Sequence, residues 1–142
     1  MAVTGAGVYS YGNRTPAGSS LSEYLRREAP RRDTKVYVVK TTPQQDAAVL
    51  EYLKRYPNTD LPKDLLSELL LDNCSVRSNG ALDAAGIPFP VFVDPAGFGG
   101  FTLQPSQPGT SGYRALAAGA TVISIPRGST SIPAELRQFE RP

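Results

Sequence analysis

The stretch DNCSVRSNGALDAAG, residues 72–86, holds the only cysteine of the chain and has the pattern of a helix that begins near this cysteine. Asp72 or Asn73 can cap the first free backbone N–H groups, the alanines and the leucine favour a helix, and Gly86 can end it in the left-handed conformation. Cys74 is therefore predicted in the first helical turn, where the partial positive charge of the terminus favours the nucleophilic thiolate. The alternative is that Cys74 is a small hydrophobic residue of the core.

Length and composition indicate a single domain over residues 1–142. Of the 142 residues, 40% are hydrophobic, which suffices for a modest core. Residues 1–87 carry the regular patterns of that core, and residues 88–142 form a loop-rich extension with one late strand. The net charge of +2 balances 15 basic against 13 acidic residues, so electrostatics do not call for nucleic acid as a partner.

The chain has one cysteine and no histidine. These counts exclude an internal disulfide framework, a multi-cysteine metal site, and a Ser-His-Asp or Cys-His arrangement built from these residues alone. No hydrophobic run approaches the roughly 20 residues of a transmembrane helix. The N-terminal sequence MAVTGAGVYSYG also lacks the basic start and long apolar core of a signal peptide. We therefore expect no transmembrane segment, and any export must use other machinery.

Three segments have clear strand patterns. Residues 2–4 and 8–11 flank the turn formers Gly5-Ala6-Gly7 and predict an antiparallel hairpin. Residues 35–40, KVYVVK, are the clearest strand, and we expect this strand to lie centrally in the sheet. Residues 121–125 predict a further strand near the C-terminus.

Two capping boxes predict helices in the first half of the chain. One helix follows Ser20 and is expected to end before Pro30, and the other follows Thr42, with Gln45 three positions later. The second helix has an apolar face expected to pack on the sheet, made of Val49, Tyr52, Leu53 and Tyr56. A basic cluster near the end of the first helix is interpreted as a solvated face, with phosphate or partner binding as the alternative: Arg26, Arg27, Arg31 and Arg32.

The cysteine helix carries a row of small residues that would let its backbone approach a sheet closely: Cys74, Ser78, Ala81 and Ala85. Gly80 costs about 1 kcal/mol of helix propensity relative to alanine, so either packing or flexibility must account for it. Before this helix, residues 64–71, DLLSELLL, fit a short helix or an apolar connector, and we favour the helix.

The remaining tail is rich in proline and glycine. Residues 87–93, 94–100 and 104–112 predict loops or short edge strands. Residues 113–118 fit one helical turn, and residues 133–139 a short terminal helix. Taken in order, the elements predict an α+β fold with a small, mainly antiparallel sheet, helices packed on it, and the cysteine at a helix N-terminus.

Five segments of the chain form an ordered set: VYSYG at 8–12, KVYVV at 35–39, TPQQ at 42–45, DNC at 72–74 and ALDAAGI at 81–87. Together they resemble the permuted papain-like (NlpC-type or LRAT-like) cysteine hydrolase and acyltransferase domains. In particular, they are similar to the C-terminal toxin domains of bacterial polymorphic and Rhs-type effectors. The likeness covers residues 3–87 and extends loosely to ISIPRG at 123–128.

This resemblance implies that Cys74 is a nucleophile served by a histidine base, which the family places before the cysteine on the first core strand. Because the chain has no histidine, the base is expected upstream of Met1, or it was replaced, or the domain is an inactive descendant; without it, catalysis should be poor. Ser10, or alternatively Tyr9, lies on the second strand about where the family places the residue that orients the histidine; the other interpretation of Ser10 is an outward-facing strand serine. Asn73 could place its amide beside an oxyanion, or only cap the helix. No cofactor and no metal are implied.

The function implied by the resemblance is that of an effector toxin in bacterial competition, which attacks an amide, ester or thioester through a cysteine acyl intermediate. Its substrate would be a protein, a peptidoglycan crosslink or a lipid. It would be made in the cytoplasm and secreted by specialised machinery, and its partners would be a cognate immunity protein or a secretion chaperone. The alternative is a non-catalytic partner-binding domain, in which Cys74 belongs to the core and the proline- and glycine-rich tail docks the partner.

Overall fold

The protein folds as a set of helices packed around small antiparallel sheets. The computed structural model describes residues 1–11, 14–55, 74–88, 91–93, 100–102 and 109–141. The elements in chain order are β1 (Ala2–Val3), β2 (Gly7–Val8), α1 (Leu21–Glu28), β3 (Thr34–Val38), α2 (Pro43–Lys54), α3 (Cys74–Ala84), β4 (Val91–Val93), β5 (Gly100–Thr102), α4 (Thr110–Ala117), β6 (Thr121–Ile125) and the 3₁₀ helix η2 (Ala134–Phe139). The strands form the two-stranded antiparallel pairs β1–β2, β3–β6 and β4–β5. The predicted α+β class is confirmed.

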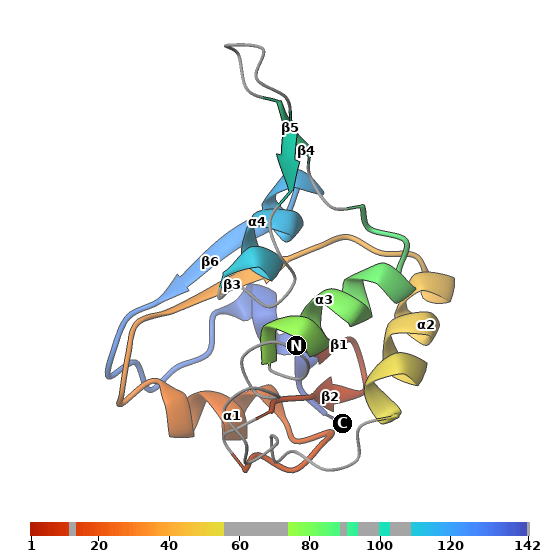
Figure 1. Ribbon diagram of the computed structural model, residues 1–142. Helices are drawn as coiled ribbons and strands as arrows, with labels where there is room; N and C mark the ends of the chain where they lie inside the picture. Colours follow the sequence, from red (N-terminus) through yellow and green to blue (C-terminus); the bar gives the residue numbers. More distant parts are fainter. Residues whose placement is uncertain (12–13, 56–73, 89–90, 94–99, 103–108, 142) are drawn as a thin grey trace, which may run out of the picture.

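Two hydrophobic clusters make up the core. The first joins the N-terminal hairpin to α2 and α3, and its buried members include Val3, Leu53 and Leu82. The second joins the hairpin to α1, the β3–β6 pair and η2, through buried residues such as Val8 and Leu136. The hairpin therefore lies between the clusters, and Figure 1 shows it between α1 and α2.

The strand pairing corrects one expectation. The predicted N-terminal hairpin is present, with Ala2 opposite Val8. The strand predicted centrally is β3, but among the described residues it pairs only with β6, with Thr34 opposite Ile125. The prediction that this strand lies centrally in the sheet was therefore wrong. One face of the β3–β6 pair packs in the second cluster. Gly112 of α4 lies against the ring of Tyr37 in β3.

The helix starts follow the capping patterns. The Ser20 hydroxyl accepts a hydrogen bond from the Glu23 N–H at 3.3 Å, at the start of α1. Both halves of the predicted capping box at Thr42 and Gln45 are formed at the start of α2. The Gln45 side chain also donates to the carbonyl of Ala85 at 2.7 Å, so the start of α2 is tied to the end of α3.

In the second half of the chain, α4 is longer than the single predicted turn, and the predicted terminal helix is the 3₁₀ helix η2. Tyr56 and the helix predicted at residues 64–71 lie outside the described residues. Among the helices described, none is long and apolar enough to span a membrane.

A buried arginine fixes the C-terminal half of α3. Arg114 of α4 is only 1% exposed. Its guanidinium donates to the carbonyl of Ile87 at 2.9 Å and to the carbonyl of Asn79 at 3.0 Å, and it forms an ion pair with Asp83. Buried backbone carbonyls need such partners, so Arg114 fastens α3 and the residues after it to α4.

The face of α3 that carries the small residues Ala81 and Ala85 packs against a helix rather than a sheet. Ala81 and Ala85 are buried in the first cluster together with Val49 and Leu53 of α2. The close approach expected against a sheet is therefore made against α2. A Cβ added at Gly80 would lie 2.0 Å from the hydroxyl oxygen of Tyr52, so packing accounts for this glycine.

Replacing Gly80 by alanine is expected to lower the free energy of unfolding by about 1–3 kcal/mol, the cost typical of overpacking. The gain of about 1 kcal/mol in helix propensity does not offset the displacement of the Tyr52 ring. Urea unfolding measures the change. In a Tyr52→Ala background the same substitution should become neutral or stabilising; an equal loss in both backgrounds would contradict the packing explanation.

Candidate functional site

Cys74 is the first residue of α3, and its side chain is exposed. The prediction that the cysteine begins a helix is confirmed, and the alternative that it belongs to the core is wrong. The other end of the helix also follows the prediction: Gly86 has a φ of +68°, and the Ile87 N–H donates to the Leu82 carbonyl at 3.0 Å. Asn73 lies outside the described residues, so its proposed role stays a prediction.

The start of α3 lies beside the N-terminus of the chain, as Figure 1 shows, and Cys74 interacts electrostatically with the Met1 amino group. This amino group donates a hydrogen bond to the Tyr9 carbonyl at 2.9 Å. Burial lowers the pKa of the Met1 amino group to about 6, and the negative charge of an ionised Cys74 opposes that shift. At neutral pH the amine in the 142-residue chain is therefore largely uncharged.

Tyr24 of α1 is a second group within electrostatic range of Cys74. Burial raises the pKa of the Tyr24 phenol above its ordinary value, the Glu28 carboxylate raises it further, and Arg32 and a hydrogen bond with Ser10 oppose the rise. Tyr24 therefore keeps its proton at neutral pH. A protonated phenol can donate a hydrogen bond to a reacting group.

Ser10 is half-buried and lies two residues after β2, which ends at Val8. Its predicted position on the second strand was therefore wrong. The last hydrogen bonds of the hairpin join Tyr9 to Met1, so Ser10 lies beyond the ladder. A hydrogen bond with Ser10 lowers the pKa of the Tyr24 phenol, so Tyr24 is a partner of this serine that the sequence did not indicate.

Arg32 supplies the positive charge of this neighbourhood. The Arg32 guanidinium forms an ion pair with Glu28, whose side chain is 3% exposed. The hydrogen bond with Glu28, together with the attraction of its charge, raises the pKa of Arg32 above its ordinary value. Arg32 therefore stays cationic, paired with Glu28, and has a minor electrostatic interaction with Cys74.

Of the predicted site residues, Cys74 and Ser10 each affect the pKa of Tyr24. Tyr24 and Glu28 were not predicted from the sequence, which assigned Arg32 to a solvated face. Their spacing in the sequence is the signal that could have identified Tyr24, Glu28 and Arg32 as neighbours. The three residues are spaced four apart, which places Tyr24 and Glu28 on one face of α1 and Arg32 just beyond its end. The described residues include no group of three histidine, cysteine or acidic side chains that could hold a metal ion.

No protein-family model matches this chain, and neither a curated protein nor a solved structure matches it significantly.

Proposed function

We propose that this chain is a cysteine-dependent hydrolase or acyltransferase domain of the permuted papain-like kind, acting as a bacterial effector toxin, with Cys74 as its nucleophile. The observation that carries the proposal is the exposed thiol at the start of α3 with a cation, Arg32, and a protonated phenol, Tyr24, in electrostatic range. These groups suit acyl transfer, because the thiolate is the attacking form of cysteine and the reaction develops negative charge on the carbonyl oxygen.

In the proposed reaction, the Cys74 sulfur bonds to the carbonyl carbon of an amide, ester or thioester. The bond to the leaving group breaks, and the leaving group takes up a proton, for which Tyr24 is the candidate donor. Water or an acceptor nucleophile then attacks the acyl-cysteine and releases Cys74. The first step needs only a thiolate, whereas fast release needs a base to activate the second nucleophile. Since the chain has no histidine, we expect acylation with slow turnover.

Acylation by p-nitrophenyl acetate tests this proposal without knowledge of the natural substrate. At pH 7 the folded chain is expected to gain one acetyl group, several-fold faster than the same chain unfolded in urea, because the fold holds the exposed Cys74 sulfur at the positive end of the α3 helix dipole. Intact-mass spectrometry follows the reaction. The adduct should be absent from the Cys74→Ala variant, while Tyr113→Phe, at an exposed tyrosine of α4, should leave the rate unchanged.

Equal rates for the folded and the unfolded chain would contradict the nucleophile proposal. That outcome would favour a second candidate function, a non-catalytic domain whose tail docks a partner such as an immunity protein or a secretion chaperone. Exposed apolar side chains in the tail support this candidate: Tyr113 and Leu116 of α4 are 59% and 44% exposed, and Val122 of β6 is 42% exposed.

A further inference from the structure

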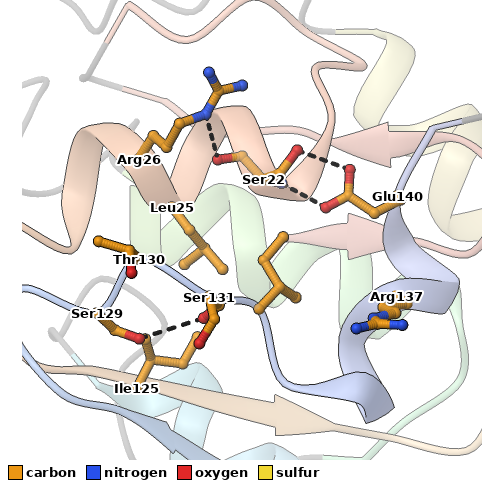
Figure 2. A pocket seen from close by; sticks show the side chains of 10 residues that line it. Ser22, Leu25, Arg26, Ile125, Ser129, Thr130, Ser131, Arg137 and Glu140 are labelled. Atoms are coloured by element: carbon orange, nitrogen blue, oxygen red, sulfur yellow. Dashed lines mark hydrogen bonds between the residues drawn. The ribbon is translucent and has the colours of Figure 1, made fainter.

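A groove of about 500 Å³ lies between α1, the end of β6, the segment 129–132 and η2. Its volume falls within the range of small-molecule sites, about 300–1,000 Å³. Figure 2 shows the side chains of Leu25 and Ile125 along it, with Ser129, Thr130 and Ser131 nearby. The groove therefore combines an apolar wall with a row of hydroxyl groups.

Two arginines line this groove, Arg26 from α1 and Arg137 from η2. Both are exposed, and among the described residues neither pairs with a carboxylate. The Arg26 side chain donates one hydrogen bond, to the Ser22 carbonyl at 3.4 Å. The Arg137 guanidinium makes no hydrogen bond with a described residue, so its donors can meet a ligand.

One acid, Glu140, also lines the groove, and its carboxylate already has partners. It accepts hydrogen bonds from the Ser22 N–H at 2.7 Å and the Ser22 hydroxyl at 2.9 Å, at the start of α1 (Figure 2). The helix terminus stabilises this negative charge. Two guanidinium groups and one carboxylate leave the groove with a net charge of +1.

We propose that this groove binds an aliphatic carboxylate. A single carboxylate neutralises the net charge of +1, whereas a phosphate dianion would exceed it. The carboxylate would bond to Arg137, since guanidinium and carboxylate match in geometry, and the aliphatic part would lie against Leu25, Ile125 and Ile132. The site is separate from the proposed nucleophile, because Cys74, Tyr24 and Glu28 do not line it.

Amide-resolved NMR titration of the ¹⁵N-labelled 142-residue chain tests the proposal. The probes are octanoate and N-acetylleucine, which represent a free acid and a peptide C-terminus, and their neutral amides are the matched controls. We expect one of the acids to bind with a Kd on the order of 1 mM, with shifts at Ser22 and residues 129–132, and its amide to bind at least about tenfold more weakly. The acid that binds identifies the source of the ligand.

Substitutions at exposed arginines separate the site from general attraction of anions. Arg137→Gln should weaken binding about tenfold, and Arg31→Gln, which removes an exposed charge outside the groove, should leave it unchanged. Equal losses in the two variants would overturn the proposal. So would equal binding of acid and amide, binding of inorganic phosphate as tight as that of the acid, or no shift at about 10 mM of either acid, well above the Kd expected for ligands of this size.

Discussion

Replacing Arg114 by methionine is expected to lower the free energy of unfolding by about 3–5 kcal/mol, the loss typical of breaking a buried charged network. The guanidinium is 1% exposed and bonds to the carbonyls of Ile87 and Asn79. Each buried acceptor that loses its partner costs about 1–3 kcal/mol. Loss of the ion pair with Asp83 adds little to this cost, because the Asp83 side chain is 62% exposed and water can solvate it. Urea denaturation followed by circular dichroism measures the loss.

Arg31→Met is the matched control, since Arg31 is exposed, and it should change stability by no more than about 0.5 kcal/mol. Arg114→Lys keeps the charge but not the planar group that reaches several acceptors, so its effect should fall between the two. A loss below about 1 kcal/mol for Arg114→Met would show that α3 is held mainly by its apolar contacts rather than by this network.

Replacing Gly7 by alanine should prevent stable folding or destabilise the chain by more than about 3 kcal/mol. Gly7 has a φ of +84°, and an added Cβ would lie 2.6 Å from the Ser19 carbonyl oxygen and 2.7 Å from that of Gly18. Both atoms belong to the backbone, which bonds to Val8 there. The contact cannot be relieved by rotating a side chain, so the hairpin or the segment beside it has to move.

Gly5 provides a control within the same turn. Its φ of +70° carries the same left-handed strain, but an added Cβ would meet no atom within 4 Å. Gly5→Ala should therefore cost only the strain, about 1–2 kcal/mol. Thermal and urea unfolding of both variants separate the cost of backbone strain from the cost of the steric clash with the backbone at Gly18 and Ser19. If the two substitutions cost the same, the close approach at Gly7 has no energetic role.

The sequence predicted the features that depend on residues close together in the chain. The capping box at Thr42, the left-handed Gly86 and the N-terminal hairpin formed as expected. At Ser20 only the N-cap half of the expected box is present, because the Glu23 carboxylate pairs with Arg27. Each depends on a hydrogen bond or a backbone angle between near neighbours. The start of a helix at Cys74 belongs to the same group. Local propensities and caps suffice for such features without knowledge of the rest of the fold.

Features that join distant segments could not be predicted in this way. The pairing of β3 with β6, the packing of α3 on α2 around Gly80, and the burial of Arg114 each depend on which surfaces meet. An arginine in a short helix pattern usually indicates an exposed side chain. The carbonyls of Asn79 and Ile87, which Arg114 meets only once α4 packs on α3, help to make its burial favourable.

The same division applies to Cys74. The helix-start pattern, in the sequence alone, determined that the cysteine begins a helix, because this depends on the propensities and the closing glycine of residues 72–86. Tertiary structure decided that the thiol is exposed and that Tyr24 and Arg32 are its electrostatic neighbours. These groups come from α1 and the turn after it, and only the packing of the two core clusters around the hairpin brings that segment toward the start of α3.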